Sequence, residues 1–313
     1  MKNCYSLAFA FGLAATASSL HATTFSLPQG DDGLVGKEQR ITVGRKDTLI
    51  DLGRLHGFGY DEISAANPGI DPWMPADGST LILPHAHILP EAPREGIVIN
   101  VSEMRLYYFP KSTGTVETYP VSVGRTEWNT PLVTTKIVRK AANPTWYPPA
   151  SIRKEHLQKG DPLPAVVPPG PDNPLGKYAL YLGTAGYLLH GTNNENGVGM
   201  QVTHGCMRLY APDVQRLFER VPVGTTVRIV NQPYKVGWRD GVLYVEVHSL
   251  EEGGSTHQQS SSTALTQLVH KQLQAYMDYP VDWQAVEQAK VEATGLPVAV
   301  GPRITVAENS SAQ

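Results

Sequence analysis

The chain has 313 residues, 41% of them hydrophobic, and a formal net charge of −3. This length suggests about two domains, and the hydrophobic content is sufficient to fill their cores. The slightly negative charge argues against binding to nucleic acid or to an anionic membrane surface. Glycine (29) and proline (25) are frequent along the chain, which favours a mainly β fold of short strands joined by turns.

The N-terminus has the pattern of a secretory signal peptide, residues 1–22. Lys2 precedes an apolar run over residues 5–17, and a cleavage site follows Ala22. The run is too short for a membrane-spanning helix, which needs about 20 residues, although an uncleaved anchor is the alternative. Cys4 lies in this leader, so the mature chain would keep only Cys206. A lone thiol in an oxidising compartment is usually removed or put to use, which favours a catalytic role.

Residues 40–84 predict a small unit with the order βααβ. Asp47 and Thr48 can cap its first helix, and Asn67-Pro68 ends its second. The expected elements are a strand over 41–43, a helix over 49–55, a helix over 60–66 and a strand over 80–83.

This unit resembles the LysM module, on the match of Ile41-Thr42-Val43, Asp47-Thr48-Leu49, Ala66-Asn67-Pro68, Ile70, Gly78 and Leu81-Ile82-Leu83-Pro84. It departs from the module at Lys46, where a glycine is usual. The resemblance implies binding to N-acetylglucosamine-containing glycans such as peptidoglycan. The implied glycan-binding residues are Asp47, Thr48, Asn67, Pro68 and Ile70. A spacer without glycan affinity is the alternative.

A proline-punctuated linker over 85–94 leads to a second domain over 95–231. Its many short strands and one short helix, over 212–219, predict a β-sandwich or barrel. A β-hairpin extension over 232–250 follows, and then a linker and helical tail over 251–313. The strands expected in the second domain cover 97–101, 104–109, 116–124, 132–140, 178–182, 187–190 and 226–230, and the tail helices cover 264–277 and 283–293.

A long proline-rich segment over 143–174 interrupts these strands. Segments of this length in compact domains are usually functional lids or disordered. The embedded Trp146 and Tyr147 favour an ordered lid over the site.

Cys206 and His190, sixteen residues upstream, are the candidate chemical centre. A cysteine nucleophile must be a thiolate, and a nearby histidine favours that state. His190 ends a predicted strand, which can hold its ring, and Gly191 after it leaves the site open. Gly205 permits unusual backbone angles, so that amides there could face a developing oxyanion. Arg208 is close enough in sequence to bind a substrate carboxylate.

These motifs resemble the catalytic domain of the L,D-transpeptidases (the YkuD family). The matching residues are His190-Gly191-Thr192 and Thr203-His204-Gly205-Cys206-Met207-Arg208, with Asn173-Pro174-Leu175-Gly176 and Thr130-Pro131. The resemblance implies the L,D-transpeptidase β-sandwich, with Cys206 as nucleophile and His190 as general base. His204, Gly205, Gly191 and Arg208 would support the oxyanion or the substrate. Together with the LysM match it implies a periplasmic enzyme of a Gram-negative bacterium.

The same resemblance implies the reaction. The thiolate would attack the carbonyl between meso-diaminopimelate and the terminal D-alanine of a peptidoglycan tetrapeptide stem, and D-alanine would leave. An amine would then resolve the thioester, giving a 3→3 cross-link or attachment of an outer-membrane lipoprotein through its lysine. Carbapenems resemble acylating donors for this family. No cofactor is implied, because thiol acyl transfer requires none.

Several alternatives stay open or are disfavoured. His204 is a second candidate base, because it lies two residues from Cys206. A metal site from His190, His204 and Cys206 fits no compact zinc spacing. NlpC/P60 peptidases place the cysteine before the histidine, and sortases separate the two much more widely. A peptidoglycan-binding module without chemistry conflicts with the intact His190 and Cys206. Hydrolysis, with water as acceptor, is the main alternative reaction.

Overall fold

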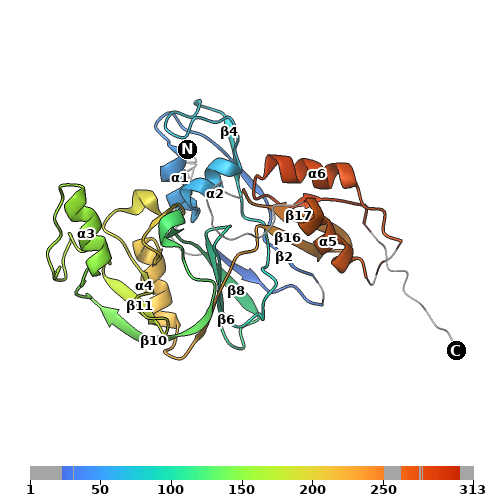
Figure 1. The fold of residues 1–313 in the computed structure, drawn as a ribbon. Helices are drawn as coiled ribbons and strands as arrows, with labels where there is room; N and C mark the ends of the chain where they lie inside the picture. The colour runs from blue at the N-terminus through green and yellow to red at the C-terminus, as the bar shows by residue number, and fades with distance from the viewer. Residues whose placement is uncertain (1–22, 31, 250–261, 275, 277, 304–313) are drawn as a thin grey trace, which may run out of the picture.

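A nine-stranded sheet forms the centre of the molecule, in the strand order β1-β8-β7-β6-β15-β10-β11-β12-β14. Figure 1 labels its strands β6, β8, β10 and β11. The structure is a computed structural model, which describes residues 23–30, 32–249, 262–274, 276 and 278–303. The predicted signal peptide, with Cys4, and most of the linker expected after residue 250 lie outside the described residues. Within the described ranges, no helix is long and apolar enough to cross a membrane.

The strands of the central sheet cover most of the ranges expected from the sequence, and the mainly β fold is confirmed. The pairs β6–β15 and β12–β14 are parallel, whereas the other pairs in the sheet are antiparallel. The strands are β1 (Thr23–Ser26), β6 (Gly96–Asn100), β7 (Arg105–Phe109), β8 (Thr115–Pro120), β10 (Thr134–Ala142), β11 (Tyr178–Leu182), β12 (Leu188–His190), β14 (Met207–Arg208) and β15 (Thr226–Val230).

Helix α4 (Ala211–Arg220) packs on this sheet and closes its main core. Pro212 begins the helix, where a missing backbone N–H has no cost. Val214 and Leu217, three residues apart, lie on one face and are fully buried against the strands. The helix directly follows β14, so its packing also fixes the end of the chain segment that carries Cys206.

The N-terminal unit has the expected βααβ order and its own apolar core. Its elements are β3 (Gln39–Thr42), α1 (Leu49–His56), α2 (Tyr60–Ala65) and β4 (Thr80–Leu83). Thr48 caps α1 as expected, since its hydroxyl accepts a hydrogen bond of 3.1 Å from the Asp51 amide. Gly57 ends α1 in the left-handed conformation, at a φ of 77°.

Close backbone contact and a buried ion pair join this unit to the central sheet. A Cβ atom on Gly199 would lie only 2.1 Å from the Gly59 Cα, so neither chain can move closer. Arg105, 1% exposed in β7, donates a hydrogen bond of 2.9 Å from Nε to Glu62 of α2. Removing one partner of such a buried pair typically costs about 3–5 kcal/mol. The unit is therefore fixed to the rest of the molecule rather than tethered to it.

The expected β-hairpin and the helices of the tail share one apolar core. This C-terminal unit contains β16 (Tyr234–Arg239), β17 (Val242–Val247), α5 (Ser262–Gln272), α6 (Trp283–Glu292) and β18 (Val298–Ala299). Strand β18, which was not expected, pairs with β17. Lys235 joins this unit to the central sheet, since its buried ammonium lies 2.8 Å from Glu103 and 2.6 Å from Glu246.

Residues 85–94, expected to be a linker, are largely packed. Strand β5 (His87–Ile88) pairs with β2 (Leu34–Val35), and Ile88 is 1% exposed. The prolines of this segment predict a linker, and a two-residue strand is too short to give a periodic signal. The remaining short elements are β9 (Val123–Gly124), η1 (Thr126–Trp128), α3 (Ala150–Gln158), η2 (Glu195–Gly197) and β13 (Gln201–Thr203).

Candidate active site

The parallel pairing of β12 with β14 brings His190 and Cys206 to one face at the edge of the central sheet. In this register His190 lies opposite Arg208, and Leu189 lies opposite Met207. Leu189 and Met207 are fully buried in the main core. Side chains alternate between the two faces of a strand, so His190 and Arg208 lie on the other face. Cys206, two residues before Arg208, shares that face.

The turn that carries Cys206 is held in an unusual backbone conformation. Gly205 has a φ of +100°, and a Cβ there would approach Tyr187 to 2.8 Å, so only glycine fits. The Thr130 hydroxyl donates to the Gly205 carbonyl at 2.9 Å. The buried Thr203 donates in the same way to the Cys206 carbonyl at 2.6 Å. These bonds fix the carbonyls of the turn and thereby the position of the thiol.

Burial keeps both reacting groups neutral at rest. It raises the pKa of the Cys206 thiol to about 11. Burial, followed by the nearby Arg208 charge, lowers the pKa of His190 to about 4. The lowered thiol pKa expected from a neighbouring histidine is therefore not found. The resting site holds a thiol and a neutral imidazole, because a charged pair would have to be formed away from water.

The ring of His190 is oriented by a backbone carbonyl. Its Nδ1 donates a hydrogen bond of 2.6 Å to the Gly191 carbonyl, which leaves Nε2 as the unprotonated nitrogen. The Cys206 thiol donates to the Gly186 carbonyl at 3.5 Å rather than to this imidazole. The thiol's hydrogen bond to Gly186 must therefore be given up before the ring can take the proton, and catalytic contacts often tighten only when substrate binds.

Arg208 has an unmet hydrogen-bonding group at the site. Its buried Nε lacks a partner among the described residues, and burial lowers its pKa. One of its terminal nitrogens lies beside Gly197, 3.4 Å from where a Cβ would be. A guanidinium with an open donor beside a thiol can bind a carboxylate of a substrate.

His204 points toward the proline-rich loop. Its Nε2 lies 2.9 Å from Glu155 of α3, and its ring packs edge-on against Trp128 at 5.1 Å between centroids. Burial lowers its pKa, so the neutral ring donates its Nε2 hydrogen to the carboxylate. His204 therefore links the turn that carries Cys206 to residues 143–174.

Residues 143–174 form a long loop that contains α3, and the lid over the site that Trp146 and Tyr147 predict stays a prediction. Trp146 and Val167 exchange two backbone hydrogen bonds of 2.9 Å across its neck. The Asn173 amide, 1% exposed, donates to the Pro144 carbonyl at 2.9 Å and closes the base. Tyr147 is 69% exposed and does not help to close it. The sequence did not predict this structural role of Asn173, although the residue begins the Asn173-Pro174-Leu175-Gly176 segment that resembles the family.

Three of the expected glycan-binding residues hold the N-terminal unit together. Thr48 caps α1, and Asp47 accepts a hydrogen bond of 2.8 Å from the Gly44 amide. The buried Asn67 amide donates to the carbonyls of Ile63 and Ile82, both at 2.8 Å. We therefore assign Asn67 to the fold rather than to a ligand surface.

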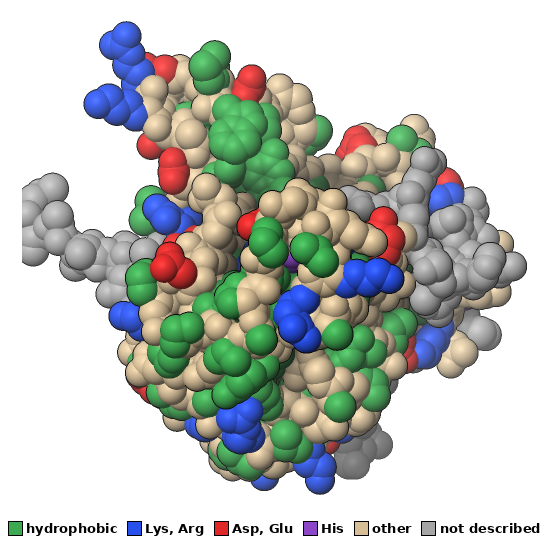
Figure 2. Space-filling model, turned by 60° about the vertical axis from the view of Figure 1, so that its left-hand side comes forward, with side chains coloured by type: hydrophobic (Ala, Val, Ile, Leu, Met, Phe, Trp, Pro, Cys, Tyr) green, Lys and Arg blue, Asp and Glu red, His purple; other side chains and the backbone are tan. Residues whose placement is uncertain are grey.

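An exposed apolar surface lies beside the start of α1. The Leu49 amide donates to the Pro72 carbonyl at 2.9 Å, which brings the loop after α2 against this helix. That loop holds the exposed Pro68 and the half-buried Ile70, and it also carries Trp73 and Met74, which are 63% and 78% exposed. Figure 2 shows hydrophobic side chains gathered on this upper unit. Trp73 was missed because no periodic pattern surrounds it.

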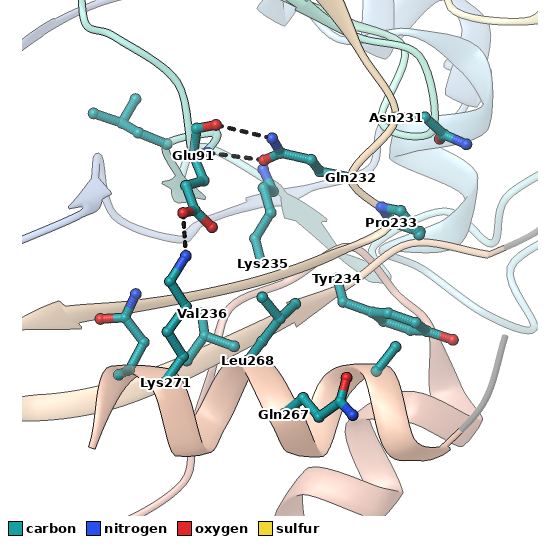
Figure 3. A pocket seen from close by; sticks show the side chains of 13 residues that line it. Glu91, Asn231, Gln232, Pro233, Tyr234, Lys235, Val236, Gln267, Leu268 and Lys271 are labelled. Atoms are coloured by element: carbon teal, nitrogen blue, oxygen red, sulfur yellow. Dashed lines mark hydrogen bonds and ion pairs between the residues drawn. The ribbon is translucent and has the colours of Figure 1, made fainter. Parts of the chain in front are cut away.

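A cavity of about 450 Å³ lies between β16 and α5 (Figure 3). Glu91 and Lys271 face each other across it, and Gln232 exchanges hydrogen bonds with the Glu91 backbone. Its lining contains none of the residues around Cys206. The cavity therefore belongs to the C-terminal unit and its contact with Leu89 and Glu91.

One group of described residues has the spacing of metal ligands, but a cation already occupies its centre. The ligand atoms of His87, Glu103 and Glu246 lie within 4.8 Å of one another. The Lys235 ammonium bonds both carboxylates. Its charge offsets theirs in the way that a metal ion would.

Comparison with known proteins identifies the family. The model of the YkuD L,D-transpeptidase catalytic domain matches residues 94–229. The chain belongs to the L,D-transpeptidase family, whose members are acyltransferase-type enzymes. It is 42% identical over 307 residues to the probable L,D-transpeptidase YbiS of Escherichia coli K12, covering 95% of this chain and 98% of that one. It is 44% identical over 248 residues to the probable L,D-transpeptidase YcfS of the same organism, covering 77% of each chain.

Solved structures similar to this chain include L,D-transpeptidase 3 from Mycobacterium tuberculosis. That structure is 16% identical, covers 49% of this chain and 75% of its own, and aligns with a TM-score of 0.33. An Enterococcus faecium L,D-transpeptidase with a Cys-to-Ser substitution is 16% identical, covers 43% and 49%, and has a TM-score of 0.32.

Proposed function

We propose that this protein is an L,D-transpeptidase that acts on peptidoglycan tetrapeptide stems, with Cys206 as nucleophile and His190 as general base. The observation that supports this most directly is the β12–β14 register, in which His190 lies opposite Arg208, two residues after Cys206. The relatives named probable L,D-transpeptidases support the same reaction class.

The reaction begins when His190 Nε2 takes the thiol proton. The Cys206 sulfur attacks the meso-diaminopimelate carbonyl, and the amides of the turn at Gly205 and Cys206 stabilise the oxyanion. The carbon–nitrogen bond to D-alanine breaks, and the imidazolium returns its proton to the departing amine. A second amine then attacks the thioester, the carbon–sulfur bond breaks, and the thiol is restored by the proton that the amine loses through His190.

The product of disaccharide-tetrapeptide tests this function. Mass spectrometry after incubation should show a dimer that lacks one D-alanine, because diaminopimelate serves as both donor and acceptor. A tripeptide without dimer would support hydrolysis, or would direct the next incubation to a lipoprotein lysine as acceptor. Unchanged tetrapeptide in every incubation would refute the proposed activity. The expected location of the enzyme is the periplasm, where both acceptors and the stem are found.

We also propose that the N-terminal unit binds the glycan strands of peptidoglycan through Pro68, Ile70, Trp73 and the surface beside Thr48. An exposed apolar surface of this kind commonly marks a binding site. Deleting residues 25–90 is unsuitable as a test, because Phe25 and Leu89 pack in a core with Tyr107 of the central sheet.

Point substitutions give a cleaner test of this surface. Trp73→Ala should weaken cosedimentation with peptidoglycan sacculi by roughly tenfold, the effect of losing about 1.4 kcal/mol of binding energy. Leu55→Ala is the matched control, because Leu55 is 50% exposed on α1 of the same unit. Equal sedimentation of the two variants and the unaltered protein would contradict this binding role.

A further inference from the structure

Helix α3, in the segment 143–174 that was predicted to be a lid, is held to the catalytic domain by charge rather than by apolar packing. None of its nine residues is buried, and Leu157 is 66% exposed. The neck of its loop is fixed by Asn173 and by the Trp146–Val167 pair, as described above. An element without a buried apolar face opens at low free-energy cost. The attachment of α3 must therefore come from specific polar contacts.

Glu155 supplies those contacts. Its two carboxylate oxygens both lie 2.7 Å from Arg125 Nη2, and one lies 2.9 Å from His204 Nε2. Lys159, one turn along, adds a contact of 2.6 Å. Arg125 and His204 both lie outside the loop that carries α3, and Glu155 binds both.

Both partners are coupled to the turn that carries Cys206. The Arg125 amide donates to the Thr203 carbonyl at 3.0 Å, and His204 stands between Thr203 and Gly205. Trp128, three residues after Arg125, packs against the His204 ring. One carboxylate thus joins the lid, the segment after β9 and the nucleophile turn.

We propose that Glu155 is a positioning residue that latches α3 to the nucleophile turn through His204, and that the closed lid keeps water from the thioester so that an amine resolves it. This inference rests on the proposed function. It attributes the preference for an amine over water as acceptor to the closed lid. Closing a site excludes water and suppresses hydrolysis of reactive intermediates. Loss of the latch should therefore shift the products from dimer to tripeptide.

Hydrogen exchange tests the latch without reference to activity. In Glu155→Gln, the amides of residues 150–158 should exchange roughly three- to tenfold faster, and those of β12 should not change. Raising salt from about 0.01 M to about 1 M should accelerate exchange of α3 in the unaltered protein by screening the same ion pairs. Asp161→Asn is the matched control, because Asp161 pairs with His156 of α3 but with no residue outside the loop. Unchanged exchange in Glu155→Gln would overturn the latch.

Product analysis tests the positioning role. Glu155→Gln should lower the dimer-to-tripeptide ratio by roughly tenfold and lower kcat more than KM, since a misplacement near 1 Å is costly for chemistry. If Glu155 acts through His204, its effect on the ratio should largely vanish in the His204→Gln background. Faster exchange with an unchanged ratio and kcat, or additive effects of the two substitutions, would overturn the positioning role. If the unaltered protein forms neither product, the proposed function fails, and exchange still decides the latch.

Discussion

Replacing Cys206 with alanine will reduce acyl transfer by about 10⁴-fold or more, the scale seen when a catalytic nucleophile is removed. Cys206 is the one free cysteine among the described residues. The nearby Thr130 and Thr203 cannot replace it, because their hydroxyls donate hydrogen bonds to the carbonyls of the turn. The substitution removes a small half-buried group, so the fold should be kept. The measurement is the rate of dimer formation, with thermal unfolding to verify the fold.

Covalent labelling by a carbapenem tests the role of Cys206 independently of the reaction rate. A carbapenem should add one equivalent of mass to the unaltered protein at Cys206 and none to Cys206→Ala. The matched control is Cys4→Ala, in the predicted signal peptide, which should react like the unaltered protein. Adduct formation in Cys206→Ala together with its loss in Cys4→Ala would reverse the assignment of the nucleophile.

The acid limit of the reaction will lie near pH 4, well below the value of 6.5 for an unperturbed histidine. The free enzyme is active when His190 is neutral, and burial extends that neutral range downward. As pH falls through the lowered pKa of His190, the imidazole gains a proton and can no longer accept one from the thiol. The measurement is kcat/KM against pH, which reports groups of the free enzyme.

His190→Ala should lower kcat by about 10²–10⁴-fold, the usual contribution of a positioned base, and should remove this acid limit. His270→Ala is the matched control, because His270 lies on the exposed side of α5. An acid limit at or above 6.5 in the unaltered enzyme would show that burial does not lower the pKa of His190. That result would contradict the lowered pKa of His190 but would leave its identity as the base unaffected.

The sequence predicted the regular elements well because their patterns are local. The period-two strands of the central sheet and the capped helix after Thr48 carry their signals within a few residues. The two-residue strands β5 and β14 do not, since their pairing depends on partners far away in the chain. Helix α3 was not expected, because the prolines around it predict only a loop.

The candidate site was recognised by residue type, whereas its electrostatics were not. His190 and Cys206 could be named from their motifs, but the neutrality of both groups depends on burial that only the folded sheet creates. The contact of His204 with Glu155 joins residues that are 49 positions apart, and no motif spans them. The same limit explains why Asn67 was read as a ligand residue when its amide holds β4.

The backbone contact between Gly59 and Gly199 limits how this protein can be rebuilt. With 2.1 Å between a Cβ on Gly199 and the opposite Cα, a side chain at that position has no room. A chimera that carries a different N-terminal module would have to bring a glycine to the same place and a carboxylate to meet Arg105. The N-terminal unit and the central sheet are therefore complementary at both contacts. Homologous N-terminal modules will be exchangeable only where the glycine and the carboxylate recur.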